Sequence, residues 1–187
     1  EVVHVDLYFF EDVDVVLLNV EVAADDLSLA QTQEILYRFG RGYPSGWNAA
    51  GQPLHTMAGV EWLDADGRVL AINAVMAGCK PAYLPVIIAG VKAMLADVFN
   101  LHGVQSTTHM STPTFVVNGP IARTLDINSK AGCLGSGFRP NATIGRALRL
   151  IMMNLGGGIP GETDKATFGH PGKYAYLWAE NEAESPW

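Results

Sequence analysis

The sequence Asn141–Leu155, NATIGRALRLIMMNL, contains the clearest helical pattern of the chain. Its apolar side chains recur at the three- and four-residue spacing of one helix face, at Ile144, Leu148, Ile151 and Met152. Asn141 is a favourable N-cap residue, and the three glycines that begin at Gly156 end the pattern. The stretch therefore predicts an amphipathic helix that buries one face against a hydrophobic core.

Helices and strands alternate on both sides of this helix. Lys80–Asp97 predicts a helix that begins at Pro81, because proline is well tolerated in a first helical turn. Thr114–Val117 predicts a short buried strand, and Lys173–Glu180 predicts a last strand before an acidic tail. This alternation favours an α/β domain.

The first 71 residues show a different pattern. Glu1–Phe10 and Val13–Val22 predict the two strands of a hairpin, and the segment from Ser28 to Gly40 predicts a helix. A second hairpin is expected from Val60–Leu63 and Arg68–Ile72, which flank a turn sequence. We therefore predict a small α+β unit of ββαββ order at residues 1–71, followed by the α/β domain at residues 72–187.

The composition excludes several classes of protein. The chain has 187 residues, of which 49% are hydrophobic and 17% are charged, so it can fold around a core. Its net charge of −7 argues against binding to nucleic acid. Its apolar runs are shorter than the roughly 18 residues of a membrane-spanning helix, so we expect no membrane contact. Two cysteines and no secretory signal pattern favour a cytoplasmic location, and we expect no cofactor.

Cys79 is the leading candidate for a catalytic nucleophile. It comes directly before the predicted helix, where the helix dipole and the Lys80 ammonium would favour the thiolate. A small buried cysteine in a tight turn is an equally good interpretation. Cys133 lies in a second Ala-Gly-Cys tripeptide, so the two thiols could form a redox pair. A metal site that uses both cysteines and histidines is a weaker alternative, since no His-x-x-x-His spacing supports it.

The glycine-rich segment before the helix at Asn141 is the candidate anion site. Unpaired N–H groups at a helix N-terminus bind anions, and the Arg139 guanidinium would strengthen the capture of a carboxylate or phosphate. The spacing of the glycines matches neither of the common nucleotide-binding loops. We assign substrate binding to Lys80, Asn118, Gly135, Gly137, Arg139, Asn141 and Thr143.

His102 and His109 are the candidate proton shuttles. Both lie in a polar segment between a predicted helix and a predicted strand, where α/β proteins often carry their functional side chains. Glu180 ends the last predicted strand, so its carboxylate could act as a base or orient a histidine. Hydrogen-bonded loop histidines and a solvated acidic tail are the simpler interpretations of the same residues.

Five segments of the chain together resemble a known family. They are Asn73–Pro81, Phe99–Gln105, Val117–Pro120, Arg139–Ala147 and Ala179–Glu182. Over about residues 72–187 the chain resembles the C-terminal region of the UGSC-motif (seleno)protein family, whereas residues 1–71 resemble no family. The resemblance implies an α/β protein that is a thiol- or selenol-linked enzyme, or the companion half of one with a UGSC-motif partner chain or domain. The tetrapeptide of selenocysteine or cysteine, Gly, Ser and Cys that gives the family its name is absent from this sequence.

These observations together favour an enzyme, or an enzyme subunit, that acts on a small anionic metabolite. Arg139 and the N-terminus of the Asn141 helix would hold the anion, Cys79 would supply the thiol, and His102 or His109 would move the proton. The competing hypothesis is a non-catalytic partner subunit whose glycine-rich loops form an interface. In both cases we expect an oligomer.

Overall fold

The computed structural model describes residues 4–9, 15–21 and 68–185 of the chain. The helix expected from Ser28 to Gly40 and the strand expected at Val60–Leu63 lie outside the described residues.

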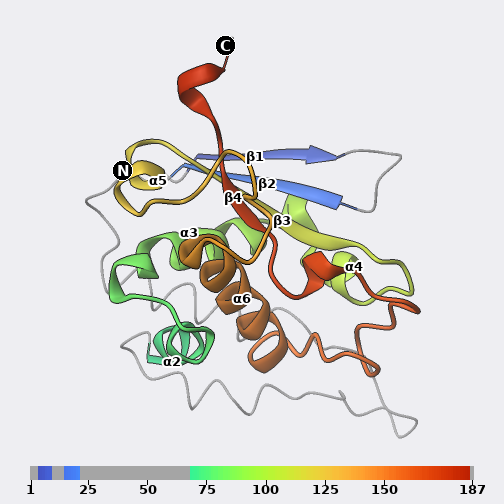
Figure 1. The fold of residues 1–187 in the computed structure, drawn as a ribbon. Coiled ribbons are helices and arrows are strands. Elements are labelled where there is room, and N and C mark those ends of the chain that lie inside the picture. The colour runs from blue at the N-terminus through green and yellow to red at the C-terminus, as the bar shows by residue number, and fades with distance from the viewer. Residues whose placement is uncertain (1–3, 10–14, 22–67, 186–187) are drawn as a thin grey trace, which may run out of the picture.

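The described strands form one four-stranded sheet in the order β1-β2-β3-β4 (Figure 1). The strands are β1 (His4–Phe9), β2 (Val15–Glu21), β3 (Thr112–Asn118) and β4 (Leu177–Ala179). β1 and β2 pair antiparallel, which confirms the first two predicted strands, whereas β2 with β3 and β3 with β4 pair parallel. β2 and β3 thus pair across the predicted domain boundary, which itself stays a prediction.

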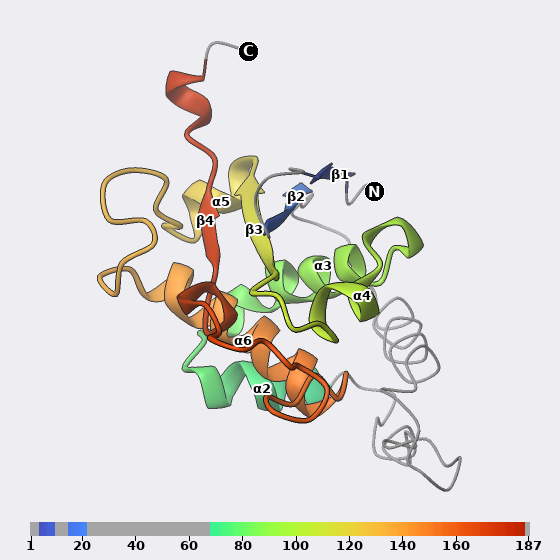
Figure 2. The ribbon, with the colours of Figure 1, turned by 90° about the vertical axis from the view of Figure 1, so that its right-hand side faces the viewer.

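The three longest described helices lie on one side of this sheet (Figure 1, Figure 2). α3 (Leu84–Met94) and α6 (Arg139–Asn154) contact the strands, and α2 (Arg68–Ala77) packs against α6. The mixed α/β class is thereby confirmed. Among the described helices, none combines the length and the apolar character that a bilayer crossing requires. The shorter elements are α4 (Leu101–Gln105), α5 (Pro120–Thr124) and the 3-10 turns Pro81–Tyr83, Asp97–Phe99, Pro171–Lys173 and Glu182–Glu184.

The strand expected at Arg68–Ile72 is wrong, because these residues begin α2. Leu70, Asn73 and Ala74 are buried, at the three- and four-residue spacing of a helix rather than the alternation of a strand. The Asn154 amide of α6 donates a hydrogen bond of 2.7 Å to Asn73 Oδ1, so α2 and α6 are joined by polar as well as apolar contacts. The last strand of the predicted ββαββ order is therefore a helix.

The single helix expected at Lys80–Asp97 is divided into shorter elements. Pro81 begins a 3-10 turn, and α3 begins after it with Pro85 in its first turn. Both prolines thus occupy positions where the missing backbone N–H costs no helical hydrogen bond. α3 ends at Met94, and a second 3-10 turn follows.

α6 confirms the helix that the sequence pattern predicts most clearly. Ile144, Leu148 and Ile151 have no exposed surface, so the predicted apolar face is the buried one. Gly145 lies on the same helix where a Cβ atom would come within 2.9 Å of the backbone nitrogen of Tyr176. The absence of a side chain at this position therefore lets α6 pack closely against the segment that leads into β4.

β4 is shorter than the strand expected at Lys173–Glu180. Pro171–Lys173 form a 3-10 turn, in which the Gly172 N–H donates a hydrogen bond of 3.0 Å to His170 Nδ1. Strand pairing begins only at Leu177. Because Lys173 lies in this turn and not in the strand, its side chain can reach the carboxylate of Asp164.

Candidate functional site

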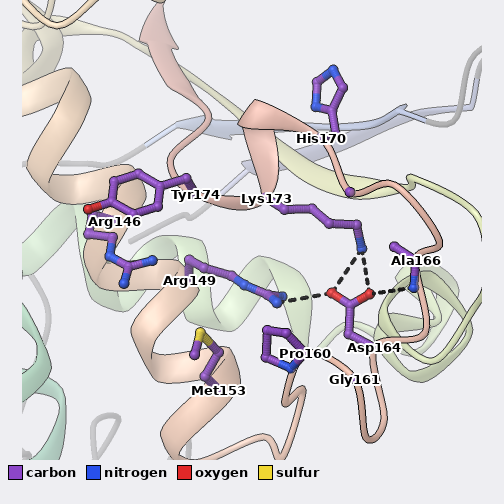
Figure 3. Close-up of a pocket in the computed structure, with 11 residues that line it drawn as sticks. Arg146, Arg149, Met153, Pro160, Gly161, Asp164, Ala166, His170, Lys173 and Tyr174 are labelled. Atoms are coloured by element: carbon purple, nitrogen blue, oxygen red, sulfur yellow. Dashed lines mark hydrogen bonds and ion pairs between the residues drawn. The ribbon is translucent and has the colours of Figure 1, made fainter.

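A cavity of about 400 Å³ lies between α6 and the segment 160–174 (Figure 3). α6 contributes Arg146, Arg149 and Met153 to its wall, and the later segment contributes Asp164 and Lys173 among others. A cavity of this volume can hold a small organic molecule.

A buried cluster of three charged side chains forms one wall of this cavity. Arg149 Nη2 lies 3.0 Å from Asp164 Oδ2, and Lys173 Nζ lies 3.0 Å from both carboxylate oxygens. The side chains of Arg149, Asp164 and Lys173 are 7%, 3% and 10% exposed, respectively. Two cations therefore share one carboxylate in a region with little access to water.

The end of α6 brings the carboxylate to the arginine. The helix stops at Asn154, and the chain turns back through Gly157, whose φ of 65° lies in the left-handed region that glycine adopts without strain. The returning segment places the Gly158 carbonyl 3.3 Å from Arg149 Nη2. Asp164 Oδ1 also accepts a hydrogen bond of 3.2 Å from the Ala166 N–H, which fixes the orientation of the carboxylate.

Arg149 has hydrogen-bond donors to spare. Both of its hydrogen bonds to described residues use Nη2, so the three N–H groups on Nε and Nη1 have no partner in the part of the chain that the structure describes. Arg149 also lines the cavity. Its spare donors can therefore serve a ligand bound there.

The charge of the cluster is not balanced. Burial holds the pKa of Arg149 below its ordinary value; the Asp164 carboxylate opposes this effect, and the positive charge of Arg146 adds to it. Among the charged residues that line the cavity, Arg146, Arg149 and Lys173 face a single carboxylate, Asp164. The cavity therefore has a net positive charge and favours an anion.

Arg146 and Tyr174 form a second part of the wall. The guanidinium carbon of Arg146 lies 4.1 Å from the centre of the Tyr174 ring, a cation–π contact. Tyr174 is 65% exposed, so this contact lies at the rim of the cavity. An arginine whose guanidinium lies over an aromatic ring can still donate hydrogen bonds from its N–H groups to a carboxylate.

The charged residues of this cavity are not among those predicted from the sequence. The available signal was Arg149, which directly follows Leu148 of the apolar stripe and so comes close to the buried face of the helix. A buried arginine requires a carboxylate. The segment 156–172 contains two acids, Glu162 and Asp164, and the sequence alone does not show which of them reaches the arginine.

Of the predicted site residues, Cys79, Arg139 and Thr143 are brought together at the N-terminal end of α6. Arg139 Nε and Nη2 donate hydrogen bonds of 3.1 and 2.9 Å to the carbonyl of Gly78. The Thr143 side chain lies beside Gly78 and Cys79, and its hydroxyl donates a hydrogen bond of 2.8 Å to the Arg139 carbonyl. Arg139 thus joins α6 to the end of α2. Lys80, the residue after Cys79, is exposed. The element that follows Cys79 is a 3-10 turn and not the expected α-helix.

Burial raises the pKa of the Cys79 thiol above its ordinary value, and the Thr143 hydrogen bond and the Arg139 charge offset only part of this effect. This direction is opposite to the one that a thiolate nucleophile needs. The missing α-helix N-terminus explains part of the difference, because a short 3-10 turn has few aligned peptide dipoles to stabilise an anion.

Alkylation of Cys79 is expected to be slower at about pH 8 in the folded protein than in the urea-unfolded chain, because less of the half-buried thiol is ionised. Peptide mass spectrometry over a range of pH gives the apparent pKa in each state. Arg139→Gln should raise the folded-state pKa further, whereas Arg139→Lys, which keeps the positive charge, should change it less. A folded-state pKa at or below the unfolded-state value would contradict this expectation and restore the thiolate hypothesis.

The prediction that Asn141 caps α6 is wrong. The helix begins two residues earlier, at Arg139, with Phe138 at the N-cap position and no side-chain cap. The buried Asn141 amide instead accepts a hydrogen bond of 2.9 Å from the Asn128 N–H and donates to the carbonyls of Asn128 and Cys133 at 2.9 and 3.0 Å. The helix begins before Asn141, with Pro140 in its first turn, where proline is well tolerated. The Asn141 side chain therefore does not cap the helix and instead holds the preceding loop.

Asn118 and Glu180 meet at the carboxyl ends of β3 and β4. Asn118 Nδ2 donates a hydrogen bond of 3.3 Å to Glu180 Oε2. Next to them, Glu182 accepts a hydrogen bond of 3.1 Å from the Gly119 N–H and pairs with Arg123 at 3.2 Å. The Glu180 carboxylate thus has an asparagine partner, where the sequence suggested a histidine.

His102 and His109 are not brought to Cys79. His102 lies in α4, and His109 lies in the exposed loop before β3, where its Nδ1 is 3.4 Å from Thr107 Oγ1. Cys79 precedes α3 and both histidines follow it. The 11 residues of α3 span about 16 Å, so a direct proton transfer between these side chains has no support in the geometry.

A second cavity, of about 250 Å³, lies against the first turn of α6. Its lining includes Cys133, Gly135 and Asn141, together with Tyr174, which also lines the first cavity. Gly137 is exposed in the same loop. Cys79 and Cys133 are both free thiols, and the described residues contain no cluster of three or more side chains that could hold a metal ion.

Comparisons of the chain with protein-family models, with curated proteins and with solved structures find no match. The function is therefore inferred from the structure alone. The fold and the site define the class: a mixed α/β protein with a cationic cavity. The resemblance to the UGSC-motif family, the UGSC-motif partner, the oligomeric state and the cytoplasmic location stay predictions.

Proposed function

We propose that this protein binds a small organic anion in the cavity between α6 and the segment 160–174. The observation that carries the proposal is the buried cluster in which Arg149 and Lys173 share the single carboxylate of Asp164. The sequence also predicted an anion-binding site, but at Arg139 and the start of α6. The site proposed here lies at the middle of the same helix.

The excess of positive charge supports a ligand rather than a purely structural ion pair. Burying a charge is costly unless it is paired, and one cation would be enough to pair Asp164. The second cation leaves one positive charge that an anion in the cavity would balance. The spare N–H groups of Arg149 and one N–H of Lys173 supply the hydrogen bonds that such an anion needs.

Chemistry through Cys79 is a separate hypothesis. Cys79 is not among the residues that line this cavity, and its raised pKa makes it a weak nucleophile at neutral pH. Anion binding does not depend on the thiol. The proposal therefore applies equally to an enzyme subunit that positions its substrate and to a non-catalytic partner that recognises one.

Lys173→Met is expected to weaken anion binding by about tenfold or more, because it removes one charged hydrogen-bond donor and leaves Arg149 and Asp164 as a balanced pair. Isothermal titration calorimetry at low ionic strength, with acetate, glutarate and inorganic phosphate as probes, measures the effect. Lys130→Met is the matched control, since Lys130 forms an exposed ion pair with Glu184 away from the cavity.

The control variant should bind each probe as the wild-type protein does. Two results would overturn the proposal. One is the absence of binding for all three anions in the wild-type protein, and the other is a Lys173→Met variant with unchanged affinity.

A further inference from the structure

The wall of the cavity carries positively charged side chains at two separate places. The first place is the buried cluster of Arg149, Asp164 and Lys173. The second is Arg146, whose guanidinium lies on the Tyr174 ring and pairs with no carboxylate among the described residues. A ligand that satisfied only one of these places would leave the other cation without an anionic partner.

Figure 3 shows how the two places are arranged. Arg146 and Tyr174 lie at one end of the view, and the Asp164 carboxylate with its two cations lies at the other. Between these two ends the Arg149 side chain extends toward Asp164, and the side chains of Met153 and Pro160 lie below it in this view. Neither Met153 nor Pro160 can donate a hydrogen bond, so this part of the wall suits the hydrocarbon part of a ligand.

We infer that the ligand is a short α,ω-dicarboxylate, a molecule with a carboxylate at each end of a chain of a few methylene groups. This inference rests on the proposed function and specifies its ligand class. One carboxylate binds the spare donors of Arg149 and Lys173, and the other binds Arg146. The methylene groups pack over Met153 and Pro160.

The charges support a ligand with two heads. The four charged residues that line the cavity, three cations and one carboxylate, leave two positive charges, which a dicarboxylate balances and a monocarboxylate does not. A phosphate group also has up to two negative charges, but it concentrates them at one place. Arg146 and Arg149 are three residues apart on α6, so their positive charges repel each other. Burial is the main cause of the lowered pKa of Arg149, and the charge of Arg146 makes a smaller contribution in the same direction. A carboxylate at each guanidinium relieves that repulsion.

Calorimetric titration with paired acids tests this inference. The probes are succinate, glutarate and adipate, each compared with the monocarboxylate of the same chain length, namely butyrate, valerate and hexanoate, and with inorganic phosphate. In the wild-type protein the best dicarboxylate should bind at least about tenfold more tightly than its paired monocarboxylate, since it gains one charged hydrogen-bonded contact.

Two variants assign this preference to Arg146. Arg146→Gln should lower the affinity for the dicarboxylate about tenfold and leave the affinity for the monocarboxylate nearly unchanged, so that the preference disappears. Arg123→Gln is the matched control, because this exposed arginine pairs with Glu182 and does not line the cavity. It should retain the full preference.

The outcomes separate this inference from the proposed function. Equal affinities for the paired acids, or tighter binding of phosphate than of any dicarboxylate, would overturn the dicarboxylate inference while anion binding stands. A preference that survives in Arg146→Gln would also overturn the inference, because the second carboxylate would then have another partner. Absence of binding for every anion would overturn the proposed function itself.

Discussion

Asp164→Asn is expected to lower the free energy of unfolding by about 3–5 kcal/mol, because it leaves two buried cations without their carboxylate. The asparagine amide would also place N–H groups toward Lys173 or Arg149, which have no acceptor to offer. Urea denaturation followed by circular dichroism measures the change, and the slope of the transition shows whether the folded state is still compact.

Two further variants identify the cause of this loss. Glu184→Gln removes the partner of Lys130 in an exposed ion pair and should shift the denaturation midpoint very little. Asp164→Asn combined with Lys173→Met should recover part of the lost stability, because the number of unpaired buried cations falls from two to one. If Asp164→Asn alone were no more harmful than Glu184→Gln, the buried cluster would have no structural importance.

Asn141→Ala is expected to destabilise the protein by about 1–3 kcal/mol. The substitution removes the hydrogen bonds to the half-buried Asn128 N–H and Cys133 carbonyl, and each such bond contributes about 0.5–1.5 kcal/mol. The Asn128 carbonyl is less affected, since it also accepts a hydrogen bond from the Ala179 N–H. Chemical denaturation measures the loss.

Asn141→Asp is the matched control for this variant. An aspartate keeps an acceptor for the Asn128 N–H and has a favourable position near the N-terminus of α6, but it cannot donate to the Cys133 carbonyl. We expect an intermediate stability. If Asn141→Asp were as stable as the wild-type protein, an acceptor near the helix N-terminus would be the main contribution of Asn141, and the hydrogen bond to Cys133 would be unimportant.

Much of the described secondary structure was predictable because it depends on local patterns. The apolar stripe of α6, the buried strand β3 and the tolerated prolines near α3 follow from side-chain spacing and backbone chemistry. Arg68–Ile72 shows where such patterns are insufficient. Its short apolar run fits a strand or a helix equally well, and contacts with α6 decide for the helix.

The candidate site was predictable only in part. The start of α6 does gather Cys79, Arg139 and Thr143, because the segments around them are held by direct hydrogen bonds. The chemistry assigned to Cys79 was not predictable, since its pKa depends on how deeply the tertiary structure buries the thiol. Asn141 is a similar case, because the same side chain can cap a helix or hold a loop.

The sequence by itself determined that the chain is acidic, that it can bury a core and that α6 presents one apolar face, since composition and periodicity are properties of neighbouring residues. Only the tertiary structure decided which charges meet. Asp164 reaches Arg149 because the glycines after α6 reverse the chain, and Lys173 joins them because a 3-10 turn delays the start of β4. These contacts connect residues of separate elements, and their energies depend on burial. For that reason the cationic cavity became visible only in the folded chain.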